Sequence, residues 1–425
     1  MLCPIQSTQA DMSHEPLRIL LLEKVMPYPP ATAGDAVYSR GIIEALSHVT
    51  ELTVLCADSG STHTMSPSIE LHQTGPQRKG QKGSVFSRWP LIAWKGAKRD
   101  YHAQLDVLLT REWDAIVLDN LGTAHALPKV EAYRRRHRRC RVVHFSHEHE
   151  YEARRKKYGA YEMGFIGRIA TRLDLFKVKR TEEKLVRRCD LVTVLNEADK
   201  HLYRSIAPNQ SFLMLTPGYD GRMAPARTLT AQTPRRVLLF GGRRPAQKQQ
   251  VLLDWLKVGY PILSNAGIET QVIGDIPDPL CKRLAQAYPD LDVRGFVDNP
   301  EALIADARAG LIVDTLGGGF KLRLLSHVFE RLPIIGLADA IEGLPVSQGE
   351  GYLAAENHEA LAQLVVATID DIDGLQALAD TALNDCEGKF SWASRARDLV
   401  AALGGAPVVA ATDGQQGNRA EEAAQ

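Results

Sequence analysis

One arrangement recurs along this chain and constrains its fold more than any other feature. A short, unbroken apolar run is followed by a loop containing Gly or Pro, and then by apolar residues at helical spacing. The first copy starts with the apolar run 18–22, continues through the loop 27–34, and ends with Val37, Ile42 and Leu46. An apolar run without alternation predicts a strand buried on both faces, as in parallel sheets covered by helices. Strand, loop and helix in this order predict a βαβ unit.

The arrangement fills two halves of the chain. Strands are predicted at 18–22, 52–56, 115–118, 141–145, 190–195 and 212–215, and then at 237–240, 270–273, 292–294, 310–313 and 333–336. A length of 425 residues also favours more than one domain. We therefore expect an α/β protein of two facing, Rossmann-like, doubly wound parallel-sheet domains, with ligands bound in the interdomain cleft beyond the carboxyl ends of the strands. The expected boundaries are a flexible leader at 1–16, an N-terminal domain at 17–216, a linker at 217–235, a C-terminal domain at 236–389, a C-terminal helix at 390–404 and a disordered tail at 405–425.

Composition excludes several classes of protein. Lys and Arg together number 51, as do Asp and Glu, so the overall charge gives no sign of a nucleic-acid partner. The six cysteines are scattered without a CxxC pair, which disfavours a zinc or redox motif and suits reduced thiols. We expect no secretory signal, because residues 1–16 carry Asp11 and Glu15 without a long apolar run, and no apolar run of about 18 residues occurs in the sequence. We expect a cytoplasmic protein.

The segment 241–248 predicts an anion site. It contains Gly242, Arg243 and Lys248 between a predicted strand and a predicted helix. Glycine allows close backbone approach, and a helix amino end offers free N–H groups and a positive dipole end. Together with the two cations, this combination suits a diphosphate. The alternative is an ordinary turn with solvated basic residues.

A second glycine-rich segment, 316–323, also lies between a predicted strand and a predicted helix. It contains Gly318, Gly319, Lys321 and Arg323. The helix dipole disfavours cations at a helix start, and an anionic ligand would remove that conflict. The alternative is a flexible loop with surface charges.

The segment 145–150 follows a strand of the first half and contains His147, Glu148, His149 and Glu150. Two His and two Glu so close together raise the question of a metal. The sequence shows no further ligand cluster, so we expect a polar site without metal. A helix cap is the alternative.

In their order and spacing, several segments resemble family 4 glycosyltransferases of the GT-B fold, from about residue 18 to 403. They are the opening loop with Gly34, the segments 190–197, 217–220, 242–248, 294–298 and 317–323, and the C-terminal segments 342–344 and 390–392. The resemblance implies a retaining, metal-independent transfer of a hexose from a nucleotide diphosphate sugar to a glycan, a lipid-linked or another small acceptor. It implies no cofactor beyond the donor, which the C-terminal domain would hold while the N-terminal domain takes the acceptor.

The resemblance also implies residue roles. Arg243 and Lys248 would hold the diphosphate, with Gly34, Gly242, Gly318, Gly319, Lys321 and Arg323 around the donor. His147 would position the sugar, and Glu150 would bind a hydroxyl or the acceptor. The family usually has a Glu for the donor ribose where this chain has Ser326. Because Ser offers only a neutral hydrogen bond, a catalytically impaired sugar- or nucleotide-binding protein is the alternative function.

Residues 134–188 form a basic block with 18 Lys and Arg against 7 Asp and Glu. Within it Ile166, Ile169, Leu173 and Phe176 recur on one helical face. A basic amphipathic helix is typical of peripheral contact with an anionic membrane, here the cytoplasmic face, and the segment 89–95 would add an apolar wedge. The alternative is a core-packed helix with a solvated basic face.

Overall fold

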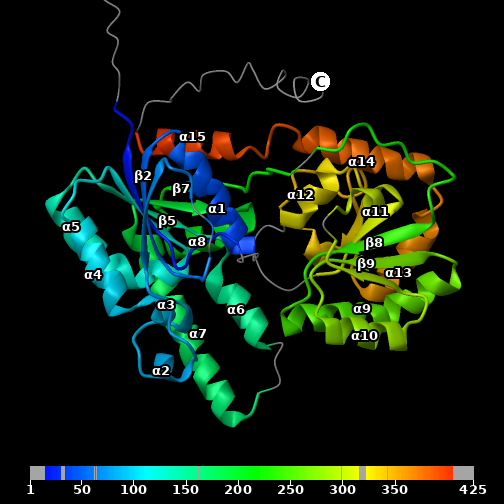
Figure 1. Ribbon diagram of the computed structural model, residues 1–425, viewed down its shortest axis with the longest axis horizontal. Coiled ribbons are helices and arrows are strands. Elements are labelled where there is room, and N and C mark those ends of the chain that lie inside the picture. Colours follow the sequence, from blue (N-terminus) through cyan, green and yellow to red (C-terminus); the bar gives the residue numbers. More distant parts are fainter. Residues whose placement is uncertain are drawn as a thin grey trace, which may run out of the picture.

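The computed structural model describes residues 15–29, 34–61, 63, 65–159, 163–221, 223–297, 299–314, 322–341 and 343–404. These residues form two parallel α/β domains, as the sequence predicts (Figure 1). The expected tail at 405–425, nearly all of the expected leader, and Gly318, Gly319 and Lys321 lie outside the described residues.

The N-terminal sheet has seven described strands in the order β3-β2-β1-β4-β5-β6-β7, and every neighbouring pair is parallel. The bounds are β1 (Arg18–Leu22), β2 (Glu51–Ala57), β3 (Ile69–Thr74), β4 (Ala115–Asp119), β5 (Arg141–Phe145), β6 (Leu191–Val194) and β7 (Phe212–Met214). Residues 19–22 of the central strand β1 have no exposed surface, which explains why that run is apolar without alternation.

Helices cover both faces of this sheet. They are α1 (Gly34–Ser47), α2 (Lys82–Val85), α3 (Leu91–Gly96), α4 (Arg99–Leu108), α5 (Leu127–Arg136), α6 (Glu150–Gly159), α7 (Phe165–Arg188) and α8 (Glu197–Ile206), with a 3₁₀ turn at Leu121–Ala126. The amino end of α1 is turned toward the C-terminal domain, whereas α4 and α5 lie on the opposite side (Figure 1).

The C-terminal sheet has six described strands in the order β10-β9-β8-β11-β12-β13, again all parallel. They are β8 (Arg236–Phe240), β9 (Glu269–Ile273), β10 (Asp292–Gly295), β11 (Ala309–Ile312), β12 (Ile334–Leu337) and β13 (Leu353–Ala355). The helices are α9 (Ala246–Asn265), α10 (Asp278–Ala287), α11 (Glu301–Ala305), α12 (Leu322–Phe329), α13 (His358–Thr368), α14 (Ile372–Cys386) and α15 (Trp392–Ala402), with a 3₁₀ turn at Ala338–Ala340.

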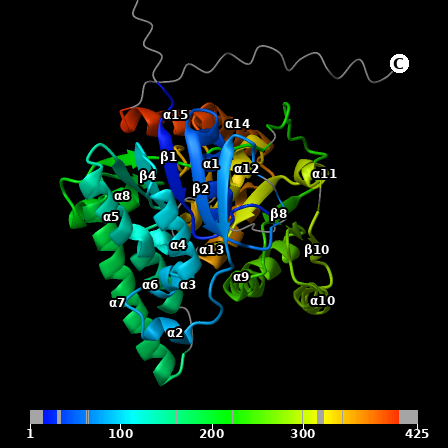
Figure 2. The same ribbon diagram turned by 60° about the vertical axis from the view of Figure 1, so that its left-hand side comes forward.

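The last helix, α15, lies against the N-terminal domain although it follows the C-terminal one (Figures 1 and 2). Its N-cap is Ser391, as predicted, whose side chain accepts the N–H of Ser394. The indole of Trp392 packs so closely on Gly41 and Gly218 that an added Cβ would lie 2.2 and 2.4 Å from it. Since any side chain would collide there, the two glycines permit the contact that ties the domains together.

In each sheet the strand order reverses once, between β1 and β4 and between β8 and β11. In open α/β sheets, ligands bind outside the carboxyl ends of the strands at such a reversal. The segments that leave β1, β4, β8 and β11 are therefore where a site is expected in each domain.

Candidate functional site

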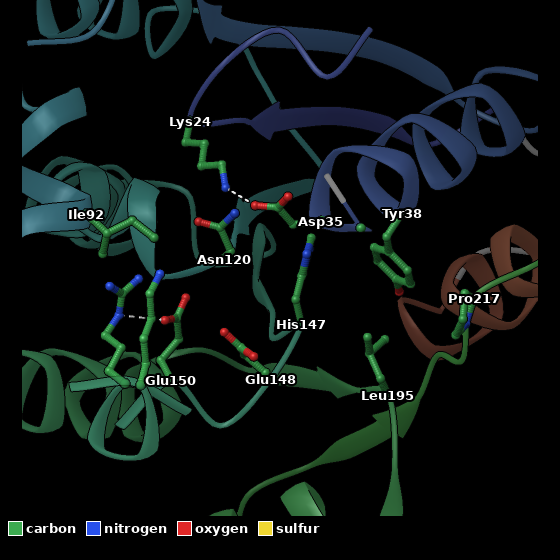
Figure 3. Close-up of a pocket in the computed structure, with 13 residues that line it drawn as sticks. Lys24, Asp35, Tyr38, Ile92, Asn120, His147, Glu148, Glu150, Leu195 and Pro217 are labelled. Carbon is green, nitrogen blue, oxygen red and sulfur yellow. Dashed lines mark hydrogen bonds and ion pairs between the residues drawn. The ribbon is translucent and has the colours of Figure 1, made fainter. Parts of the chain in front are cut away.

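A cavity of about 330 Å³ lies at the reversal point of the N-terminal sheet (Figure 3). Three of the predicted site residues, Gly34, His147 and Glu150, line it. Its other lining residues are Lys24, Asp35, Tyr38, Ile92, Asn120, Glu148, Arg154, Lys157, Leu195 and Pro217. Pro217 belongs to the predicted linker, and the rest come from the N-terminal domain. The expected interdomain cleft stays a prediction.

His147 is held by a buried carboxylate. Its Nε2 lies 2.5 Å from Oδ1 of Asp119, at the end of β4, and the hydroxyl of Ser39 donates to the other Asp119 oxygen at 2.6 Å. Burial would lower the pKa of His147, but the Asp119 carboxylate outweighs burial and holds that pKa above its ordinary value. The edge-on ring of Tyr38, 4.8 Å between centroids, fixes the imidazole from another side. The sequence therefore placed His147 in a site but missed its partner.

The entrance to α1 carries a second ion pair, between Lys24 and Asp35 (Figure 3). Lys24 lies two residues after the end of β1, and Asp35 is in the first turn of α1. Next to them the Glu23 side chain is buried, and burial together with the Asp119 charge raises the pKa of Glu23 well above its ordinary value. The two ion pairs set the cations Lys24 and His147 against the anions Asp35 and Asp119, and the raised pKa of Glu23 favours its neutral form.

The two histidines of the 145–150 segment have different partners. Nδ1 of His149 accepts the N–H of Glu152 at 3.3 Å, and its ring stacks on Tyr203. Glu182 accepts the N–H of Glu150 at 2.6 Å and so caps the amino end of α6. Part of this segment therefore forms a helix cap, which was the alternative prediction, and part of it lines the polar cavity. No group of three or more His, Cys, Asp or Glu among the described residues is arranged to hold a metal.

Glu150 lines the cavity and pairs with Arg154 one turn later in α6, at 2.8 Å between Oε2 and Nε. Its side chain is thereby oriented toward the same space as His147 (Figure 3).

A cluster of cations lies at the reversal point of the C-terminal sheet. Nη1 of Arg243, after β8, is 3.0 Å from Oδ2 of Asp314, which lies two residues after the end of β11. Arg323 of α12 pairs with the same oxygen. Lys248 of α9 lies close enough to interact electrostatically with both groups: burial and then the Arg323 charge lower its pKa, and the Asp314 charge raises it. Among the described residues, three cations surround one carboxylate here, a net charge of +2. The structure thus brings together Arg243, Lys248 and Arg323 from the two predicted segments.

Arg243 is 1% exposed, so its guanidinium does not point into bulk solvent. Burial lowers its pKa, and Asp314 opposes that effect. Its neighbour Arg244 differs: the Arg244 side chain is 73% exposed and pairs with Asp275 at the surface. The sequence analysis assigned Arg243 to the anion site, and its neighbour Arg244 lies in a different, exposed environment.

The loop after β8 depends on glycines other than the predicted one. Gly241 has φ +142° and Gly274 has φ +137°, and a Cβ on Gly274 would lie 2.3 Å from the carbonyl oxygen of Gly241. A Cβ on Gly242 would meet nothing closer than 3.8 Å. Gly241 and Gly274 therefore set the course of the loop, and Gly242 is not required on steric grounds.

Ser326 lies one turn beyond Arg323 in α12 and hydrogen-bonds to the hydroxyl of Tyr219. The Tyr219 ring stacks on Phe329 of the same helix, 4.5 Å between centroids. Ser326 thus connects α12 to the predicted linker.

Among the residues of the two sites that the sequence analysis missed are Lys24, Asp119 and Asp314. Each stands at the carboxyl end of a buried parallel strand or within two residues of it. A polar residue at that position is the signal that would have found them.

No protein-family model matches the chain, and no curated protein matches it. Solved structures do match along most of its length. A sucrose-phosphate synthase from Thermosynechococcus elongatus is 16% identical, with a TM-score of 0.63 over 92% of this chain and 100% of that one. HepE from Anabaena in complex with UDP is 14% identical, with a TM-score of 0.60 over 91% and 100%. WaaG, a glycosyltransferase involved in lipopolysaccharide biosynthesis, is 14% identical, with a TM-score of 0.58 over 90% and 99%.

At such identities the likeness shows the fold and not the activity. Two all-parallel α/β domains, with a C-terminal helix returning to the first, match these structures almost end to end. The chain therefore has the GT-B fold that its sequence segments predicted.

Proposed function

We propose that this protein is a glycosyltransferase that moves a hexose, with retention of configuration, from a nucleotide diphosphate sugar to an acceptor hydroxyl. The observation that carries the proposal is the surplus of positive charge around Asp314. A cluster with a net charge of +2 beyond the carboxyl ends of parallel strands suits a diphosphate.

The proposed chemistry is the departure of an anionic diphosphate from the sugar. Cations and N–H groups fixed in advance around the leaving oxygens stabilise the charge that develops in the transition state. Lys248 and Arg323 supply the charge, and Arg243 fixes Asp314 between them. Because side-chain cations neutralise the diphosphate, the proposed transfer needs no metal.

The proposed sugar and acceptor site is the cavity around His147. Its charges are balanced in pairs, so it offers directed hydrogen bonds without a net field, which suits neutral hydroxyl groups. Asp119 fixes the orientation of His147 for a sugar hydroxyl, and Glu150 is placed for a hydroxyl of the acceptor.

UDP is the first donor probe to use. The similar protein HepE was solved with UDP, with UDP and glucose, and with UDP-glucose. Those ligands are known for that protein, and we extend them to this chain as part of the proposal.

The test is UDP binding by calorimetry with the variants Lys248→Ala and Lys257→Ala. Both lysines lie on α9, but Lys257 is exposed and further along the helix. Removing a charged hydrogen bond worth about 1.5–3 kcal/mol should weaken UDP binding roughly 10- to 100-fold in Lys248→Ala and leave Lys257→Ala unchanged. Equal affinities in all three proteins would contradict the proposal.

Turnover separates the transferase from the impaired binding protein that Ser326 suggested. UDP released from UDP-glucose should be detectable with the unaltered chain and lost in Lys248→Ala. Tight UDP binding without any release, across a panel of glycan and lipid-linked acceptors, would favour the binding protein.

A further inference from the structure

Among the residues that the structure describes, the largest group of exposed apolar side chains lies on α2, on Phe86 beside it, and on the first half of α7. We call this region the α7 tip (α2 with residues 86 and 165–176). Phe86 is 94% exposed, Ile166 83% and Phe165 79%, with Val85, Ile169, Leu173 and Phe176 around them. In both views this end of α7 and α2 project beyond the body of the N-terminal domain (Figures 1 and 2). Contiguous exposed apolar surface of this kind marks a binding face.

The apolar stripe predicted for this segment is real, and the core-packed alternative is wrong for its first half. The buried residues of α7 are confined to its second half, from Val178 onward. The predicted wedge at 89–95 is corrected: Trp89 is only partly exposed and Pro90 is buried, and Phe86 projects instead.

Internal polar bonds hold the α7 tip in shape. The ammonium of Lys177 donates to the carbonyls of Ser84 and Val85 at 2.8 and 2.9 Å, which joins α7 to the end of α2. Asp174 accepts the N–H of Leu91 at 2.7 Å and the hydroxyl of Tyr158 at 2.8 Å, which joins α7 to α3 and α6. The polar groups are thus satisfied internally, and the apolar side chains face outward.

A groove of about 1080 Å³ runs from the α7 tip toward the His147 cavity. Its walls include Val85, Phe86 and Ile166, and apolar surface predominates in it. The groove and the cavity share four lining residues, Lys24, Ile92, Arg154 and Lys157. A molecule with an apolar part and a polar head can therefore occupy both at once.

The surroundings of the tip are basic. Lys82 and Lys95 line the groove, and Arg168 and Arg172 are exposed on α7. Another part of the basic block lies elsewhere, at the end of α5, where Arg134 pairs with Asp190. Apolar side chains ringed by cations complement an anionic lipid surface. A second copy of the chain would set these cations against one another in a symmetric contact, which disfavours self-association.

No helix among the described residues is both long and apolar enough to cross a membrane. We infer that the acceptor is an amphipathic lipid in an anionic membrane. The α7 tip inserts into the interface of that membrane. The groove takes the apolar chain of the lipid, and its polar head enters the His147 cavity. This inference rests on the proposed function and deepens it by naming the acceptor class.

Membrane binding by the α7 tip is tested with the full chain and two kinds of vesicle. One kind is phosphatidylcholine alone, and the other contains about 30% phosphatidylglycerol, which gives it an anionic surface. The double variant Phe86→Asp with Ile166→Asp is compared with Phe296→Asp, a phenylalanine that is 73% exposed in the C-terminal domain. We expect the unaltered chain and Phe296→Asp to float with the anionic vesicles, and the double variant to lose binding roughly tenfold or more.

The groove is tested separately with Ala170→Phe, which adds bulk to a lining residue without adding an indole, and Ala170→Ser as its control. The probe is phosphatidylglycerol with a pyrene-labelled acyl chain, read by energy transfer from the native tryptophans Trp89 and Trp94. We expect Ala170→Phe to bind vesicles as before but to lose the transfer signal specific to the groove, and Ala170→Ser to retain it.

The inference is overturned if the unaltered chain does not bind anionic vesicles, if the double variant binds them equally well, or if the double variant instead dissociates a dimer or releases a protein partner. UDP affinity, measured on the same samples, keeps the two proposals apart. Vesicle binding without UDP binding would refute the proposed function, whereas UDP binding without vesicle binding would refute only the lipid acceptor.

Discussion

The His147 cavity and the cluster around Asp314 occupy equivalent places in the two domains, yet their charges are arranged in opposite ways. In the N-terminal domain Lys24 pairs with Asp35, and His147 with Asp119. In the C-terminal domain one carboxylate, Asp314, pairs with two arginines, and Lys248 lies close enough to feel their charges. The charges of the first arrangement are neutralised without a ligand, whereas the second has an excess of positive charge.

The difference shows what each site is prepared to bind. Like charges held close together raise the free energy of the unliganded fold, and an anion that binds there removes part of that cost. The balanced cavity gains nothing from an ionic ligand and is suited to orienting hydroxyl groups. Each prediction below tests whether this contrast holds.

Substituting Asp314→Asn should give the largest effect. It leaves the buried guanidinium of Arg243 without its anion, and breaking a buried ion pair costs about 3–5 kcal/mol. Urea unfolding of the unliganded protein measures this loss. Inorganic pyrophosphate should restore part of the stability by supplying negative charge to the cluster.

The control is Asp275→Asn, which removes the partner of the exposed Arg244. A variant at Asp314 no less stable than this control, or one that pyrophosphate does not rescue, would show that the cluster is not strained by surplus charge. By the same reasoning Arg243→Ala should also destabilise the unliganded fold, because Arg243 is buried against Asp314.

The fold was predictable because the buried strands are unmixed apolar runs. Strands such as β1 and β4 are covered on both faces, so nearly all of their residues are apolar and each is recognised as a buried strand. The sequence missed β3 (Ile69–Thr74), a half-exposed edge strand with few apolar residues, and β13, which has three residues. It also missed α6, whose sequence is polar on nearly every face.

The sites were predictable to the extent that their residues are neighbours in sequence. The segments 145–150 and 241–248 could be recognised because each concentrates polar or charged residues, with glycine in the second, directly after a predicted strand. The structure places His147 and Arg243 within the two sites. Their partners are remote: Asp314 is 71 positions from Arg243, and Asp119 is 28 from His147. Such pairs arise from strand order, which brings β8 beside β11 and β4 beside β5, and no local pattern records them.

Asp119→Asn should have a smaller, pH-dependent effect on the balanced site. His147 can become neutral when its partner loses charge, so we expect a loss of about 1–3 kcal/mol. In the fold the pKa of His147 is raised and that of Asp119 is lowered. The pair's contribution is therefore lost as pH rises through the raised His147 pKa, and lost as pH falls through the lowered Asp119 pKa.

The stability difference between the unaltered chain and Asp119→Asn should therefore be greatest from about pH 4 to about pH 6.5, between the unfolded pKa values of Asp and His. Urea midpoints across that range measure it, and the imidazole resonance of His147 followed by NMR reports its pKa directly. A difference that does not vary with pH, or a His147 pKa below 6.5 in the unaltered chain, would contradict the ion pair.

Of the three substitutions, Arg244→Ala should have the smallest effect on stability. It tests whether the surplus charge belongs to the buried Arg243 and not to the arginine next to it in sequence. Arg244 adjoins Arg243 in sequence, but its side chain is in solvent and its bond to Asp275 is a surface ion pair, which contributes little. We expect unchanged urea midpoints and unchanged UDP affinity. If Arg244→Ala weakened UDP binding as much as Lys248→Ala, the nucleotide would have to lie on the outer face of the loop. The surplus charge around Asp314 would then have a role other than holding a diphosphate.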